Sequence, residues 1–159
     1  MTAQAEHETG GSNRRVGRVL TTLIVTNAAD EVRADTGAIP VGEIRRLAMT
    51  DVLVDTGAMS LCLPVELVQR LGLPLQRKVA VIRATGVEEL ELYEYARLEI
   101  EGRSGIFECV ALPSGSAALL GVVPMEVLGL EPDLKNRRLR LLPEAGRDTH
   151  YFAMSPIIY

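Results

Sequence analysis

The stretch Val52-Leu53-Val54-Asp55-Thr56-Gly57-Ala58 decides the fold of this chain. Three aliphatic residues lead directly into an acid, a pattern typical of a buried strand that ends at a carboxylate. A carboxylate in that position is unfavourable unless it is hydrogen-bonded, paired or used in chemistry. Thr56 can lend a hydroxyl, Gly57 allows a sharp turn, and Ala58 occupies little space. The stretch therefore presents Asp55 rather than hiding it.

This stretch resembles the active-site loop of the retropepsin-like aspartic proteases, the single-lobed relatives of pepsin. The segment Leu119-Leu120-Gly121 resembles the second signature of that family, which crosses behind the catalytic loop. In that arrangement Leu119 and Leu120 would pack under the loop, and Gly121 would let two backbones pass in contact. The resemblance covers Val16 to Leu142, and the sequence after Gly121 is more similar to bacterial stand-alone members than to viral ones.

The resemblance implies a mostly β fold, a closed or sandwich-like β-barrel of the acid-protease type with one or two short helices. Apolar periodicity predicts strands over residues 16–26, 44–54, 79–83, 87–100, 106–112 and 137–142. One helix is expected between Pro64 and Gly72, and another from near Pro124 to Gly129. Residues 27–30 and 130–136 are expected to turn, and residues 30–42 to form a long connection.

The turn Ala84-Thr85-Gly86 joins two predicted strands in a long hairpin. Small residues at the tip permit close approach to a ligand. In the family that the chain resembles, a hairpin in this place is the flap that closes over bound peptide. The alternative interpretation is a tight turn without a role in binding.

A second copy of the same four residues, Asp35-Thr36-Gly37-Ala38, lies in the predicted connection. The residues before it, Glu31-Val32-Arg33-Ala34, are too polar for a buried strand. We therefore interpret Asp35 as part of a surface turn and not as a catalytic residue.

Peptide hydrolysis by carboxylates needs two of them, close enough to share a proton. The chain supplies one good candidate, Asp55, and is too short for two lobes, so two copies related by a twofold axis would have to form the pair. The resemblance implies the same arrangement: a homodimer, a peptide or protein substrate, a water between the acids, no metal or other cofactor, and Thr56 buttressing the loop. The alternatives are a dimeric binding or assembly protein of this fold with little turnover, and an unrelated small β-barrel.

The composition restricts the remaining possibilities. The 159 residues suffice for one domain, and a net charge of −4 with a pI of about 5.3 argues against a nucleic-acid partner. No apolar run is long enough to span a membrane, and no secretory signal is recognisable. With only Cys62 and Cys109 as thiols, we expect a cytoplasmic protein without a disulfide framework.

The two ends of the chain differ in character from its centre. Residues 1–15 are polar and predict a disordered arm ahead of the domain over residues 16–142. Residues 143–159 form a tail whose apolar end is expected to dock, with the dimer interface as one possibility. The solitary His7 and His150 receive no role.

Overall fold

The computed structural model describes residues 17–143, so the predicted N-terminal arm, the tail beyond Pro143, and both histidines lie outside the described residues. The strands are β1 (Leu20–Asn27), β2 (Arg46–Val54), β3 (Leu61–Pro64), β4 (Leu75–Arg83), β5 (Gly86–Ile100), β6 (Arg103–Leu112), β7 (Leu119–Leu120), β8 (Leu130–Asp133) and β9 (Arg138–Leu141). The helices are α1 (Ala28–Asp35), α2 (Val65–Leu71) and α3 (Val122–Leu128), with a 3₁₀ turn η1 at Val41–Glu43.

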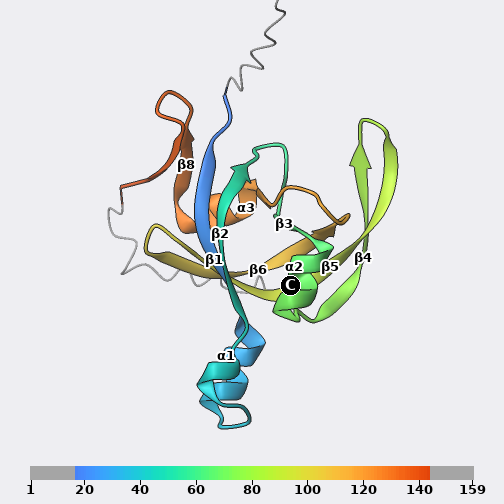
Figure 1. Cartoon of the computed structure of the whole chain (residues 1–159). Helices are drawn as coiled ribbons and strands as arrows, with labels where there is room; N and C mark the ends of the chain where they lie inside the picture. The colour runs from blue at the N-terminus through green and yellow to red at the C-terminus, as the bar shows by residue number, and fades with distance from the viewer. Residues whose placement is uncertain (1–16, 144–159) are drawn as a thin grey trace, which may run out of the picture.

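Seven strands form one sheet in the order β1-β2-β7-β3-β6-β5-β4, and β1 also pairs with β5. This additional pairing closes six of the strands into a ring and leaves β4 as an outer strand beside β5 (Figure 1). The mostly β, closed fold expected from the sequence is thereby confirmed. Strands β8 and β9 form a separate two-stranded sheet.

The main core lies within the ring and under α2 and α3. Inward positions alternate along the ring strands, as in the buried pair Val25 of β1 and Leu98 of β5. All four residues of β3 are buried, because this strand lies between β6 and β7 and is covered on both faces. The two short helices expected from the sequence are confirmed as α2 and α3, which end at Gly72 and Gly129 in left-handed conformations.

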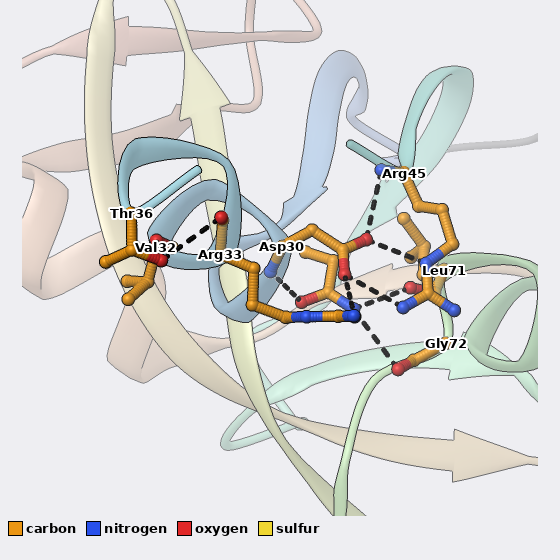
Figure 2. Close-up of polar contacts among 8 residues, drawn as sticks. Asp30, Val32, Arg33, Thr36, Arg45, Leu71 and Gly72 are labelled. Atoms are coloured by element: carbon orange, nitrogen blue, oxygen red, sulfur yellow. Dashed lines mark hydrogen bonds and ion pairs between the residues drawn. The ribbon is translucent and has the colours of Figure 1, made fainter. Parts of the chain in front are cut away.

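The turn predicted at residues 27–30 is wrong, because α1 begins there and also occupies the first part of the connection predicted over residues 30–42. It raises the number of α-helices within residues 17–143 to three. Asn27 caps this helix by accepting a hydrogen bond from the Asp30 backbone N–H (3.1 Å). Its Nδ2 also donates to the carbonyl oxygens of Leu71 (2.9 Å) and Gly72 (3.1 Å) (Figure 2). An Asn followed three residues later by Asp fits either a turn or a capped helix, and the contacts with α2 favour the helix.

An ion pair between the buried Asp30 and the exposed Arg45 holds α1 to the start of β2. Asp30 is 1% exposed, and Arg45 donates to its carboxylate from Nε (2.7 Å) and Nη2 (2.9 Å) (Figure 2). The Arg45 side chain holds the pKa of Asp30 below its usual value, against the opposing effect of burial. A bidentate pair of this kind fixes the direction in which β2 starts.

Two further segments differ from expectation. Residues 130–136, predicted to turn, contain β8, which forms a hairpin with β9. Pro132 is compatible with this strand because a two-stranded sheet leaves edge positions that need no N–H donor. Strand β4 begins at Leu75, four residues before the predicted start, since an outer strand tolerates polar residues such as Gln76 and Arg77.

Candidate active site

Asp55 follows the last residue of β2 and is held by backbone hydrogen bonds on both sides. Its N–H donates to the carbonyl oxygen of Leu120 (3.0 Å), and its Oδ1 accepts the N–H of Gly57 (2.8 Å). The N–H of Ala58 donates to the Asp55 carbonyl oxygen (3.2 Å), which closes a tight turn. The Asp55 side chain is partly buried, whereas Thr56 and Gly57 are exposed. The loop therefore offers the carboxylate to one open face.

Strand β7 lies directly beside this loop. It runs parallel to β2, with Leu119 opposite Leu53 and Leu120 opposite Val54. Leu120 is fully buried in the main core. This pairing continues β2 up to Asp55 and leaves little freedom to the backbone on which the carboxylate is mounted.

Gly121 lies where the chain crosses the Asp55 loop. The N–H of the next residue, Val122, donates to the Ala58 carbonyl oxygen (2.9 Å). The N–H of Val123 donates to the Met59 carbonyl oxygen (2.9 Å). A Cβ atom on Gly121 would lie 2.4 Å from the carbonyl oxygen of Ser60. Side chains do not fit at such a distance, so the crossing requires glycine.

The hairpin of β4 and β5 projects from the ring (Figure 1). Arg83 pairs with Gly86, so Ala84 and Thr85 form a two-residue loop at its tip. Gly86 has a φ of +130°, a conformation that suits glycine. Ala84, Thr85 and Gly86 are exposed, as are the apolar side chains beside them, Ile82 (85%) and Val87 (72%).

A small apolar cluster connects the hairpin to the Asp55 loop. Cys62, Leu90 and Leu112 are buried in it, and partly buried side chains pack around them. These surrounding residues are Ala58, Val79, Val81, Val110 and Leu119. We call this set the cleft cluster, because it includes a residue of the Asp55 loop, residues of the hairpin and a residue of β7.

The pKa of the Cys62 thiol depends on burial and on two charged side chains near the cleft cluster. Burial raises the pKa of its thiol to about 11, the Asp55 carboxylate adds to this effect, and Arg83 opposes it. Arg83 and Asp55 are therefore both near enough to Cys62 to act on it electrostatically. Because the pKa is raised, the thiol stays protonated at neutral pH and is not an activated nucleophile.

The second Asp-Thr-Gly-Ala copy lies at the other end of β2. Asp35 ends α1, where the Thr36 N–H donates to the Val32 carbonyl oxygen (3.0 Å) and the Gly37 N–H donates to that of Ala34 (3.0 Å). Since α1 precedes the first residue of β2 and Asp55 follows the last, about 27 Å of strand lies between the two regions. Asp35 is exposed and lines an open cavity of about 750 Å³ beside α1, in which Asp55 has no part. It cannot complete a carboxylate pair with Asp55 within one chain.

Sequence reasoning missed an exposed apolar surface beside Asp55. Met59 (71% exposed) follows the loop, and Val123 (40%) and Val127 (62%) lie one turn apart on α3. Met59 and Val123 are adjacent through their backbone hydrogen bond. We call these three residues the α3 surface. The spacing of two valines by four residues was visible in the sequence, but the contact of α3 with the loop was not.

The arrangement supplies one oriented carboxylate per chain. Such a group can accept a proton from water or donate one to a leaving group, but a single carboxylate cannot do both at once. Within residues 17–143, no group of three or more His, Cys, Asp or Glu side chains is placed to hold a metal ion. Over the same residues, no helix is long and apolar enough to cross a membrane.

Comparison with known proteins gives one family. A family model described as gag-polyprotein putative aspartyl protease matches residues 42–128, which is more than half of the chain. The matched region begins before β2 and ends with α3, so it includes the Asp55 loop, the hairpin and Gly121. A search of curated proteins found no match.

Proposed function

Because the chain belongs to this aspartyl protease family, we propose that it is a homodimeric aspartic endopeptidase acting on peptide or protein substrates. The observation that carries the proposal is the position of Asp55 at the end of β2, with its backbone bonded to β7 and its side chain bonded to Gly57. A water molecule activated between two Asp55 carboxylates, one from each chain, would attack the peptide carbonyl.

The chemistry divides between the two identical acids. One Asp55 carboxylate takes a proton from the attacking water, while the other, protonated, donates a hydrogen bond to the substrate carbonyl and later passes its proton to the leaving nitrogen. Two ionised carboxylates in close contact repel each other, so the state in which the pair holds one proton is favoured. Which chain supplies the acid is decided by the bound substrate, because the two sites titrate as a pair.

The α3 surface supports association next to the catalytic loop. Met59, Val123 and Val127 expose apolar side chains in one region, and such groups of exposed apolar residues mark interaction sites in soluble proteins. Met59 lies four residues after Asp55 in the chain, so a twofold contact through this surface would bring the two carboxylates near the axis.

The hairpin tip would act as a flap over the substrate. Ile82 and Val87 are cross-strand partners with largely exposed apolar side chains beside Ala84, Thr85 and Gly86. Closure over a bound peptide would bury these side chains and exclude bulk water from the carboxylates.

A cytoplasmic location remains part of the proposal. Cys62 and Cys109 are both free and buried, which suits a reducing compartment.

Subunit mixing tests the shared pair directly. Wild-type protein is mixed with a ninefold excess of Asp55→Asn protein, allowed to exchange subunits, and assayed for peptide cleavage at constant wild-type concentration. If the active site needs Asp55 from both chains, random pairing lowers activity roughly tenfold. An Asp55→Asn protein that has been chemically cross-linked as a dimer, and so cannot exchange, serves as control and should leave activity unchanged. Unchanged activity with exchangeable subunits would contradict the proposal.

A dimer that binds peptides but does not cleave them would support the alternative, a binding or assembly protein of the same fold. That outcome is recognised by digesting a broad peptide library with and without a statine-type inhibitor at several protein concentrations. Cleavage that the inhibitor blocks, and that falls on dilution, supports the peptidase.

A further inference from the structure

The loop over residues 113–118 joins β6 to β7 and borders the region between the hairpin and the Asp55 loop. Leu112, just before it, and Leu119, just after it, both belong to the cleft cluster. At its end, the Ala118 carbonyl oxygen accepts the N–H of Leu53 (3.0 Å). The ends of this loop are thus fixed, while Pro113, Ser114 and Gly115 are exposed.

One carboxylate from another element holds the middle of the loop. Glu66, in the first turn of α2, accepts the N–H of Gly115 on its Oε1 (3.0 Å), and its Oε2 is out of contact with solvent. The Gly115 N–H is the largest cause of a lowered pKa for Glu66, with smaller contributions from the Glu66 N–H and the Ser114 side chain. The hydrogen bond joins residues 49 positions apart in the chain.

The loop can take other shapes without this bond. Gly115 has a φ of +79°, and glycine populates several backbone conformations with similar ease. Within the loop, the Ser116 hydroxyl donates to the Pro113 carbonyl oxygen (2.6 Å), which fixes the local turn but not its direction relative to α2. Among the hydrogen bonds of the described loop residues, only the contact with Glu66 fixes the position of the loop relative to α2.

The start of the loop also borders a cavity of about 280 Å³. Leu112 and Pro113 line one side together with Val65, and Lys78, Glu89 and Leu90 of the hairpin line the other. Moving the loop would therefore change the space between α2 and the hairpin. Because Leu90 belongs to the cleft cluster, such a change would reach the apolar side chains that connect the hairpin to the Asp55 loop.

We propose that Glu66 is a positioning residue that holds the loop over residues 113–118 in place as one wall of the substrate cleft and thereby sets the affinity for substrate. This inference rests on the proposed peptidase function. A loop that must be ordered when substrate binds reduces affinity, whereas a loop that is already held does not. The hydrogen bonds of Asp55 to Leu120 and Gly57 do not involve Glu66, so the chemical step should be spared.

The test compares Glu66→Ala and Glu66→Gln with Glu108→Gln, which removes an exposed carboxylate from β6, the strand that leads into the loop. For Glu66→Ala we expect KM to rise roughly fivefold or more with kcat within about twofold of wild type, because the lost interaction concerns binding and not the chemical step. Glu66→Gln, which keeps an acceptor oxygen, should recover part of the loss. Glu108→Gln should match wild type.

Hydrogen exchange of the Gly115 amide, followed by NMR, is the second readout and needs no activity. It should accelerate roughly five- to tenfold in Glu66→Ala, since the N–H loses a charged acceptor. Unchanged exchange would overturn the proposal, and so would a loss of kcat with KM unaltered. Wild-type protein that cleaves no peptide refutes the proposed function itself, a result distinct from a wild-type peptidase whose KM does not depend on Glu66.

Discussion

Gly121 and Ser60 approach so closely that a Cβ atom on the glycine would lie 2.4 Å from the Ser60 carbonyl oxygen. The carbonyl oxygen of Ala58 and the carbonyl carbon of Met59 would each be 2.7 Å away. All three obstacles are backbone atoms, which cannot rotate aside as a flexible side chain would. The position of the Asp55 loop therefore depends on the absence of a side chain at one residue of the β7–α3 junction.

Gly121→Ala should destabilise the protein by about 2–4 kcal/mol and displace the Asp55 loop, because overpacking against backbone forces the chain apart. Urea unfolding measures the first effect and peptide cleavage the second. Gly42→Ala is the matched control: a Cβ atom on Gly42 would have nothing within 4 Å, and the stability of this variant should stay within about 0.5 kcal/mol of wild type. Equal stability of the two variants would show that the crossing has room for a side chain.

Asp55→Asn should lower peptide cleavage by at least about 10³-fold, since an amide cannot exchange protons as the acid–base pair requires. The Asn side chain keeps an oxygen that can accept the Gly57 N–H, so folding and dimerisation should persist. Asp35→Asn, at the exposed end of α1, should leave cleavage unchanged. Loss of cleavage in the Asp35 variant would instead assign the catalytic role to the second Asp-Thr-Gly-Ala copy.

Val127→Glu should weaken dimerisation by at least roughly tenfold by placing a charge in the α3 surface. Activity of the variant should recover as protein concentration is raised, and analytical ultracentrifugation gives the association constant directly. Val41→Glu, on the exposed 3₁₀ turn away from the Asp55 loop, is the control. An interface elsewhere would be indicated if the Val41 variant dissociated and the Val127 variant did not.

Asp30→Asn should destabilise the fold by about 2–3 kcal/mol, because it leaves the Arg45 guanidinium without its charged partner. The value is below that of a fully buried pair, since the Arg45 side chain is 45% exposed and water can replace part of the interaction. Thermal or urea unfolding measures the loss. The Asp35→Asn variant removes a carboxylate from the same helix and should unfold as wild type does.

Stability should also fall in acid. Hydrogen bonds lower the pKa values of Asp30 (from Arg45), Glu66 (from the Gly115 N–H) and Asp133 (from the Asn136 side chain). A carboxyl with a lowered folded-state pKa stabilises the protein above its unfolded-state pKa, about 4, and this contribution disappears as pH falls through the folded-state pKa. Urea midpoints should be flat above about pH 5 and decline below about pH 4. The decline should be smaller in Asp30→Asn, and an identical decline would exclude Asp30 as a source.

The sequence was most informative where one residue type has a unique physical task. The aliphatic run into Asp55 predicted the end of β2, the Leu-Leu-Gly segment indicated a crossing behind the Asp55 loop, and glycines at 72 and 129 marked the ends of two helices. It was least informative at α1, because the hydrogen bond from Asn27 to Leu71 and the ion pair of Asp30 with Arg45 join residues 44 and 15 positions apart in the chain. Likewise, the contact of Glu66 with Gly115 and the contact of α3 with the Asp55 loop could not be predicted, because each joins segments that only the folded chain brings together.

The outer position of β4 exposes the hairpin to aggregation through its free edge. One side of this strand pairs with β5, and the other side of β4 is an edge, which in many proteins invites stacking with further chains. Lys78 forms an ion pair with Glu89 across the hairpin, and Arg83 forms one with Glu88. Charged side chains therefore lie along the edge strand that a strand from another chain would have to approach. The cross-strand ion pairs that keep the two arms of the proposed flap together thus also protect its edge against aggregation.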